Sequence, residues 1–451
     1  MKELSQLFIS LVIASLVLSA CQSQDPFVSA SRSLVVPEAA QPRSGVYALG
    51  YTRVDEDAPP KAVVDYLAAG EALIRFPYHA DGKLTFAVKV ENAITVSLWM
   101  SAQQGDEPDQ MKRYPGTDWY WITYTVPSAA TLQYHYNVKT AQDERLTLRD
   151  PLNRAVSATA PYESLWSAEL DKGASRFEYL EVPYEIPGRE KPAGYAPPVL
   201  RKVLVYLPPA YDMSRGEAYS VLYMQDGQNA WDSSTANYGG WKTDRVLKDL
   251  IGSGRVHPAI VVSIFNSSYR SEEYAGAGFA AAGRPGGARA AEIAAYYRDW
   301  VIMVLKPLID TTYRTLRDRD HTGVIGSSYG GTVAIYWSLS RPNVFGLAAA
   351  LSYAPGDEQN LDGGMTSLCR DQYLPAIAAQ KIAYPRIWLD CGQSGIDKTL
   401  APFVSALDGV LRDAHYEAGP DYHFELFPGA DHNEAAWYRR LPAILEFLLH
   451  L

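Results

Sequence analysis

The stretch VIGSSYGGTVAIYW, residues 324–337, places a serine among closely spaced glycines, between two apolar runs. Within it, Gly326-Ser327-Ser328-Tyr329-Gly330 fits the pattern G-x-S-x-G with Ser328 at its centre. A turn this sharp between a strand and a helix holds its central residue in strained backbone angles, and the flanking glycines let neighbouring backbone pass closely. The sequence therefore predicts a strand that ends in a tight turn, with Ser328 raised above a sheet at the start of a helix.

The periodicity of apolar residues changes between the two halves of the chain. Residues 45–165 contain segments such as WYWITYT, in which β-branched and aromatic residues alternate with others, as in antiparallel strands. From residue 200 onward, apolar strands such as Ala259–Ile264 alternate with amphipathic helical stretches, which predicts a mostly parallel sheet covered by helices. We expect a small antiparallel, immunoglobulin-like β-sandwich over residues 45–165, a connector over 166–199, and an α/β domain over 200–451.

The first 44 residues have a different composition. Lys2 precedes a short apolar run, Leu7–Leu18, and Leu18-Ser19-Ala20-Cys21 follows. A charged start, a short apolar segment and small residues are typical of a secretory signal. The Leu-Ser-Ala-Cys ending also resembles the lipobox of bacterial lipoproteins.

That resemblance implies cleavage of a signal peptide, residues 1–20, and diacylation of the Cys21 thiol. Residues 21–44 are rich in Ser, Pro, Ala and Gln and would form a flexible tether. We expect an extracytoplasmic protein held on a bacterial membrane by lipid, and Gln22 in place of aspartate favours the outer membrane. A plain secretory signal with an incidental cysteine is the alternative.

Charge and cysteine content argue against several partners. The formal net charge of -10 disfavours nucleic acid. No apolar run reaches the roughly 18 residues of a membrane-spanning helix. No Cys or His cluster has zinc spacing, so we expect neither metal nor cofactor. With Cys21 acylated, Cys369 and Cys391 remain, and their spacing leaves a disulfide and two buried thiols equally open.

A serine hydroxyl is a poor nucleophile unless a base removes its proton. After a nucleophile turn of this kind, the base follows the last strand and the acid lies between the two. The histidines that follow Ser328 are His415, His423, His432 and His450. We predict that His432 is the base, because it lies between an expected strand and a C-terminal helix.

Two carboxylates compete for the role of the acid. Asp390 lies within the expected strand that starts at Arg386, and Asp397 lies in the loop beyond it. We favour Asp397, because a loop side chain can reach the imidazole, fix its tautomer and stabilise the imidazolium. Asp390 remains the alternative.

A developing oxyanion needs two donors. The amide of Tyr329, at the start of the expected helix, is the first. The loop Met224-Gln225-Asp226-Gly227-Gln228-Asn229 follows an early strand, where the second donor is expected. We predict the amide of Gly227 or Gln228 as this donor, with glycine allowing close approach to substrate and Asp226 bracing the loop.

Four separated segments carry a family resemblance: VLYMQDGQNAWD, IFNSSYRSEEY, VLKPLIDTTYRTLRDRDHTGVIGSSYGG and GADHNEAAWYRRL. They resemble the esterase D group of α/β-hydrolases, which includes feruloyl and acetylxylan esterases and enterochelin esterases. The resemblance implies an α/β-hydrolase fold with Ser328 as nucleophile and His432 as base. In that family the acid often lies two or three residues after the strand-end glycine, whereas Asp397 lies five after Gly392.

The first half also has a resemblance, carried by RYPGTDWYWITYTVP, YHYNV and RDPLNR. These segments are similar to the N-terminal sandwich of enterochelin esterases. Similar sandwiches precede many carbohydrate-active enzymes, and Trp99, Trp119 and Trp121 could stack on sugars or belong to the sandwich core.

Together these features predict a serine carboxylic-ester hydrolase that acts through an acyl-enzyme. A siderophore lactone and an ester substituent of a glycan are the two candidate substrates. Alternatives are an acyltransferase with the same triad and a catalytically weak lipoprotein that binds glycans.

Overall fold

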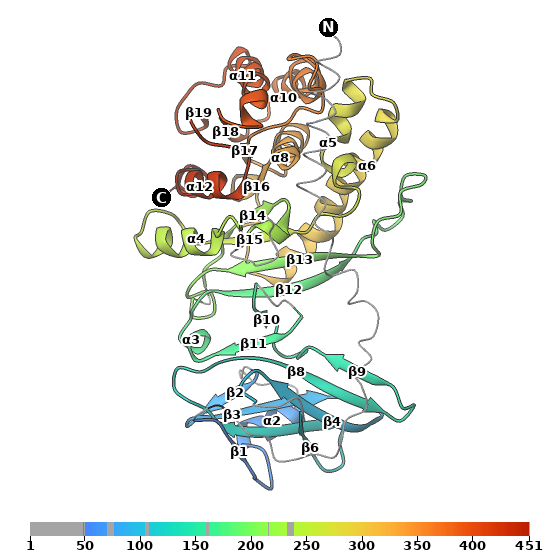
Figure 1. Cartoon of the computed structure of the whole chain (residues 1–451), viewed down its shortest axis with the longest axis vertical. Coiled ribbons are helices and arrows are strands. Elements are labelled where there is room, and N and C mark those ends of the chain that lie inside the picture. The colour runs from blue at the N-terminus through green and yellow to red at the C-terminus, as the bar shows by residue number, and fades with distance from the viewer. Residues whose placement is uncertain are drawn as a thin grey trace. The chain divides into compact units, whose positions relative to one another are not determined.

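The computed structural model describes residues 48, 50–69, 76–103, 108–158, 162–214, 216–231 and 239–450 (Figure 1). The predicted signal peptide, Cys21 and the tether lie outside these residues. Within them, none of the helices has the length and hydrophobicity needed to cross a bilayer. The described residues divide into two compact units, one up to Tyr179 and one from Leu180 onward.

The unit up to Tyr179 is built on antiparallel strands. In one sheet the order is β1-β7-β3-β2, with β6 also paired with β7. In the other, β8 pairs with β4, β9 and β11, and β10 pairs with β11 and β12. The elements are β1 (Thr52–Val54), α2 (Lys61–Ala69), β2 (Tyr78–Ala80), β3 (Lys83–Lys89), β4 (Ala93–Met100), β5 (Asp109–Gln110), β6 (Lys112–Arg113), β7 (Trp119–Thr125), β8 (Thr131–Thr140), β9 (Arg145–Leu148), β10 (Ala155–Val156), β11 (Ser164–Ser167), α3 (Ala168–Asp171) and β12 (Arg176–Pro183).

One apolar core joins the two sheets of this unit. Leu84 and Phe86 of β3 share it with Val96 and Leu98 of β4, as the period of two requires. Trp121 is only 2% exposed and packs in a smaller cluster, so it belongs to the interior. The prediction of an antiparallel sheet domain ahead of the α/β domain is therefore confirmed.

The second unit contains a mixed sheet with a mainly parallel core, in the order β19-β18-β17-β16-β14-β15-β13. Only β13 runs antiparallel to its neighbour β15 among these described strands. The strands are β13 (Leu200–Leu207), β14 (Ser220–Met224), β15 (Ala259–Ile264), β16 (Thr322–Ser327), β17 (Leu347–Leu351), β18 (Arg386–Gly392) and β19 (Tyr422–Phe427). This is the predicted α/β-hydrolase-like arrangement.

Helices lie on both sides of this sheet. Figure 1 shows α4 and α12 on one side and α5, α6 and α8 on the other. The helices are α4 (Thr243–Gly252), α5 (Arg270–Ala281), α6 (Gly287–Trp300), α7 (Lys306–Thr312), α8 (Tyr329–Ser340), α9 (Gly364–Leu368), α10 (Leu374–Gln380), α11 (Asp397–Asp413) and α12 (Glu434–Leu449). The shorter turns are η1 (Gly227–Asn229), η2 (Val301–Leu305), η3 (Arg319–His321) and η4 (Cys369–Tyr373).

Helix α11 starts earlier than the sequence pattern suggests. The pattern predicts a helix over Pro402–Asp413, but the helix begins at Asp397, so this aspartate lies in its first turn and not in a loop. A proline inside a helix removes one backbone hydrogen bond. Here the buried face, which includes Leu400 and Val404, continues on both sides of Pro402 and stabilises the longer helix.

The two cysteines of this unit are free and buried. Cys391 lies in β18 and Cys369 begins η4. Burial raises the pKa of both thiols. The open question of a disulfide between them is thus answered in favour of two buried thiols.

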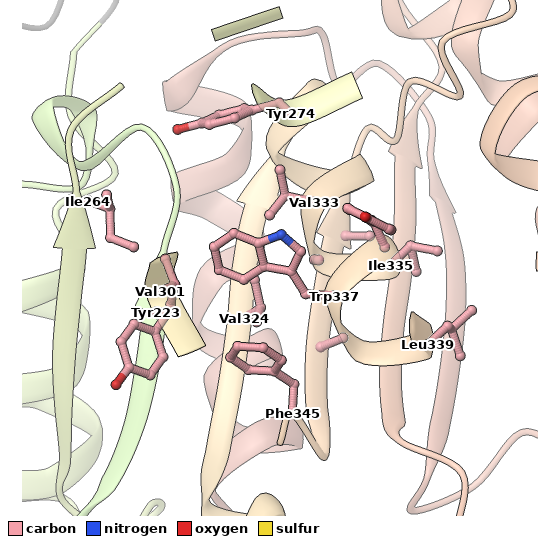
Figure 2. Close-up of a cluster of buried hydrophobic side chains, with 14 of the residues drawn as sticks. Tyr223, Ile264, Tyr274, Val301, Val324, Val333, Ile335, Trp337, Leu339 and Phe345 are labelled. Carbon is pink, nitrogen blue, oxygen red and sulfur yellow. The ribbon is translucent and has the colours of Figure 1, made fainter. Parts of the chain in front are cut away.

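Helix α8 carries the residues after Ser328 into the centre of the core. Its apolar residues surround it on all sides, as expected for a fully buried helix. Figure 2 shows Trp337 between Val333 and Phe345, next to Val324 of β16. The Trp337 and Phe345 ring centroids are 5.5 Å apart.

We expect Trp337→Ala to lower the free energy of unfolding by about 3–5 kcal/mol, because it removes a large side chain from a site that cannot collapse fully. Urea denaturation of the full chain measures this loss. Met303, which is 56% exposed, provides the control. Met303→Ala should change stability by less than about 0.5 kcal/mol, and an equal loss in both variants would contradict the assignment of Trp337 to the core.

Candidate active site

The predicted site residues gather at one edge of the sheet. Strands β14, β16, β17, β18 and β19 run parallel in continuous register. Their carboxyl ends therefore share an edge, which is where ligands bind in open α/β sheets. Asp226, Ser328, Ser352, Asp397 and His432 all follow the ends of these strands.

Ser328 occupies the turn between β16 and α8. Its backbone has φ 56° and ψ -126°, a strained conformation for a residue with a side chain. The turn is tight enough that a Cβ on Gly326 would lie 2.6 Å from the backbone of Gly330. The amide of Ser328 donates to the Leu351 carbonyl at 2.9 Å, which ties the turn to the neighbouring strand. The first glycine of G-x-S-x-G is thus required by backbone contact with the second.

His432 and Asp397 form a close pair. The Nδ1 atom of His432 lies 2.6 Å from Asp397 Oδ1, and Asp397 is fully buried. Burial alone would raise the pKa of Asp397, but hydrogen bonds from His432 and Ser352 and the charges of His432 and Arg440 hold that pKa below its ordinary value. Asp397 is thus held in its ionised form beside the imidazole.

The second oxygen of Asp397 is held by donors from two other strand ends. Oδ2 accepts from the amide of Gly392 at 2.9 Å and from the Ser352 hydroxyl at 2.7 Å. Ser352 in turn accepts from Trp437 Nε1 at 3.0 Å. A Cβ on Gly392 would lie 2.5 Å from Oδ2, so the glycine makes room for the carboxylate.

Asp390 is occupied elsewhere. Its Oδ1 atom pairs with Arg440 at 2.7 Å, and its Oδ2 atom accepts from Trp388 Nε1 at 2.8 Å. Burial raises its pKa to about 6, although Arg440 and Trp388 favour the ionised form. Arg440 also lies 3.9 Å from Asp397 Oδ2. The structure therefore pairs Asp397 with His432, and pairs Asp390 with Arg440.

The sequence did not single out Ser352, Trp437 or Arg440. Ser352 directly follows the apolar residues of β17 and has φ 46°. Trp437 and Arg440 lie four and seven residues after Asn433, the N-cap of α12. This spacing places them on one helix face, and it is the signal that could have identified them.

The loop after β14 is braced by a buried ion pair. Asp226 has φ 53° and accepts from Arg270 Nε and Nη2, both at 2.8 Å, and from the side-chain Nδ2 of Asn266 at 2.7 Å. This is the bracing role that the sequence predicted for Asp226. A Cβ on Gly227 would lie 2.6 Å from the backbone of Ser263. Glycine is therefore needed at this position for packing against β15, and its role in the approach of a substrate stays a prediction.

The predicted oxyanion donors follow the ends of two neighbouring strands, β14 and β16. Tyr329 is the first residue of α8, so its amide has no acceptor within the helix. Gln228 follows Gly227 in η1, and its side-chain oxygen accepts from the Asn266 amide at 3.3 Å. The amide of Tyr329 and the amide of Gly227 or Gln228 remain the predicted donors.

The Ser328 hydroxyl and the His432 ring are brought to the same edge of the sheet. Among the residues that the structure describes, no hydrogen bond joins the Ser328 hydroxyl to the His432 ring. Catalytic hydrogen bonds are often long before substrate binds.

His423, by contrast, stacks on Trp388 with ring centroids 3.8 Å apart. In the described part of the chain no group of three or more His, Cys, Asp or Glu side chains has the geometry of a metal site.

Comparison with known proteins places the chain in a family. Residues 197–448 match the family described as "Putative esterase". The match covers more than half of the chain, and the protein therefore belongs to this esterase family of hydrolases.

Three similar proteins have described activities. An endo-1,4-beta-xylanase/feruloyl esterase of Xylanibacter ruminicola is 26% identical over 209 residues, which are 45% of this chain and 24% of the relative. This chain thus spans about a quarter of that relative's length. The ferric enterobactin esterase of Salmonella typhimurium is 16% identical with a TM-score of 0.44, over 82% of this chain and 94% of that one. The feruloyl esterase module of Clostridium thermocellum is also 16% identical with a TM-score of 0.44, over 62% of this chain and 90% of that one.

The two carboxylates should respond differently to substitution. Asp397→Asn should lower kcat for a short acyl ester by a factor on the order of 10⁴, because the imidazole loses its orienting anion. Asp390→Asn should act mainly on stability, since it leaves Arg440 buried without its anion, a change that typically costs about 3–5 kcal/mol. Steady-state kinetics and urea unfolding of both variants separate the two effects. The reverse ranking would assign the acid to Asp390.

Proposed function

We propose that this protein is a serine carboxylic-ester hydrolase that acts through an acyl-enzyme, with Ser328 as nucleophile, His432 as base and Asp397 as acid. The observation that carries the proposal is the 2.6 Å contact between His432 and Asp397, at the sheet edge where the strained Ser328 turn also lies. Membership of the esterase family supports the reaction class.

The contact with Asp397 determines which ring nitrogen is the base. Because Nδ1 donates to Asp397 Oδ1, Nε2 carries the free electron pair. His432 Nε2 removes the proton from Ser328 as Oγ bonds to the ester carbonyl carbon. The carbonyl π electrons move to oxygen, and the amides of Tyr329 and of Gly227 or Gln228 are the proposed donors to that oxyanion.

Collapse of this intermediate expels the alcohol, which takes the proton from His432, and leaves Ser328 acylated. Water then attacks the acyl-enzyme with His432 again as the base. The acid product leaves and Ser328 is restored.

The substrate we propose is an ester outside the cytoplasm, either an ester substituent of a glycan or a siderophore lactone. The feruloyl esterase activity named for the relative in Xylanibacter ruminicola favours the glycan ester. The enterobactin esterase named among the similar structures is the reason to keep the lactone in the test. Turnover of feruloylated oligosaccharides, acetylated xylan and a catechol lactone by the full chain distinguishes these substrates.

A fluorophosphonate probe tests the nucleophile. It should label Ser328, and His432→Ala should prevent labelling because nothing then deprotonates the hydroxyl. Ser328→Ala should retain only the rate that binding and oxyanion donors supply, roughly 10³ to 10⁴ over water. Mass spectrometry of the labelled peptide and ester kinetics measure both.

Ser327 is the matched control, since it precedes the turn as the last residue of β16. Ser327→Ala should cost far less activity than Ser328→Ala. A probe adduct on Ser327, or undiminished hydrolysis by Ser328→Ala, would refute the assignment.

We also propose that a lipid on Cys21 holds the protein on the outer membrane, on the basis of the lipobox-like Leu-Ser-Ala-Cys segment. Cys21→Ser should then release the protein from membranes and abolish incorporation of labelled fatty acid. Fractionation and radiolabelling of expressing cells measure both. Membrane retention of the variant, with no label on the wild type, would show the proposal to be wrong.

A further inference from the structure

Glu434 is a buried carboxyl group that the triad does not use. It is the first residue of α12, two residues after His432, and it is only 5% exposed. Its Oε1 atom accepts from the Asn229 side chain at 3.0 Å, a contact between the loop after β14 and the loop after β19. Its Oε2 atom is buried and has no hydrogen-bond partner in the part of the chain that the structure describes.

Nearby carboxylates are neutralised by arginines, and Glu434 is not. Asp226 has Arg270 at 2.8 Å, and Asp390 has Arg440 at 2.7 Å. The partner of the Glu434 carboxylate is the uncharged side-chain amide of Asn229. An uncompensated anion in a buried site is costly unless a positive charge appears beside it.

Two positive charges act on Glu434 from different elements. Burial raises the pKa of Glu434 and the negative charge of Asp226 adds to that rise, whereas a hydrogen bond from its own backbone amide and the charges of His432 and Arg270 lower it. Arg270, at the start of α5, is already bound by both oxygens of Asp226. The charge available to Glu434 is therefore the one that His432 acquires when it accepts a proton.

We propose that Glu434 is a positioning residue that acts through His432, by stabilising its imidazolium and by joining its loop to the candidate oxyanion loop through Asn229. This inference rests on the proposed function. When the proton of Ser328 passes to His432 Nε2, the ring becomes positive beside the carboxylate of Asp397 and two residues along the chain from Glu434. Asp397 holds Nδ1, and Glu434 supplies the second negative charge without touching substrate.

The test compares Glu434→Gln with three other variants of the full chain, using p-nitrophenyl acetate as the probe. Glu434→Gln keeps an oxygen for Asn229 but removes the charge. Asn229→Ala removes the bond but keeps the charge, and Glu434→Asp keeps a shortened carboxylate. Glu425→Gln is the matched control, because it removes a similar charge from β19, where Glu425 is exposed and pairs with His423.

We expect Glu434→Gln to lower kcat about tenfold. We also expect it to move the acidic limb of kcat/KM about one pH unit lower, because a loss of imidazolium stabilisation worth a factor of ten corresponds to one pH unit. The direction follows from charge: without the nearby anion, the ring releases its proton at lower pH. Asn229→Ala should lower kcat without moving the limb. Glu425→Gln should change neither quantity.

An NMR titration of the His432 ring protons measures the same displacement without any substrate. It thereby separates this inference from the proposed function. If Ser328→Ala still hydrolyses the ester, the proposed function and the catalytic part of this inference both fail. If Ser328→Ala is inactive but Glu434→Gln leaves the limb and the NMR midpoint unchanged, Glu434 is structural and only the inference is overturned.

Should Glu434→Gln fail to fold, Glu434→Asp decides. It should keep the acidic limb near the wild-type position while lowering kcat, because the charge remains and only the bond to Asn229 is weakened. A limb displaced to lower pH in Glu434→Asp would overturn the proposal.

Discussion

The carboxylate of Asp397 is the interaction on which the arrangement of this edge depends. Its two oxygens accept hydrogen bonds from a ring nitrogen of His432, the amide of Gly392 and the hydroxyl of Ser352. These donors follow or end β19, β18 and β17, so one buried anion joins three neighbouring strand ends. Its charge is tolerated in the interior because hydrogen bonds satisfy it on both oxygens. The imidazole therefore has a defined orientation before any substrate arrives.

Behind this carboxylate the polar groups form a second layer anchored by Arg440. The guanidinium binds Asp390 and lies within 3.9 Å of Asp397. Since Arg440 and Trp437 both belong to α12, the helix that follows His432 also supplies the side chains that support Asp397, directly or through Ser352. Helix packing and catalytic geometry are thus coupled here, and a shift of α12 on the sheet would misplace the base and its support together.

The sequence predicted those features that depend on local pattern. The Ser328 turn was readable because glycines at fixed positions around a serine report a backbone constraint, and the α/β fold followed from alternating apolar strands and helices. The choice between Asp397 and Asp390 was harder, because it depends on which carboxylate the fold turns toward a residue more than thirty positions away. Glu434 and Ser352 were missed for the same reason: their partners lie on other elements of the fold, and only packing determines which helix face meets which loop.

The two buried thiols give this unit a chemical means of reporting its own opening. Cys391 lies within β18, beside the backbone of Asp397, and Cys369 lies in the core near α9. Because burial raises the pKa of both groups and hides them from reagents, alkylation requires local unfolding. The rate at which Cys391 reacts would then measure how often the strand beneath the acid opens, while Cys369 would report on a different part of the same core. The native chain therefore carries two thiol reporters of local unfolding, and neither requires an introduced label site.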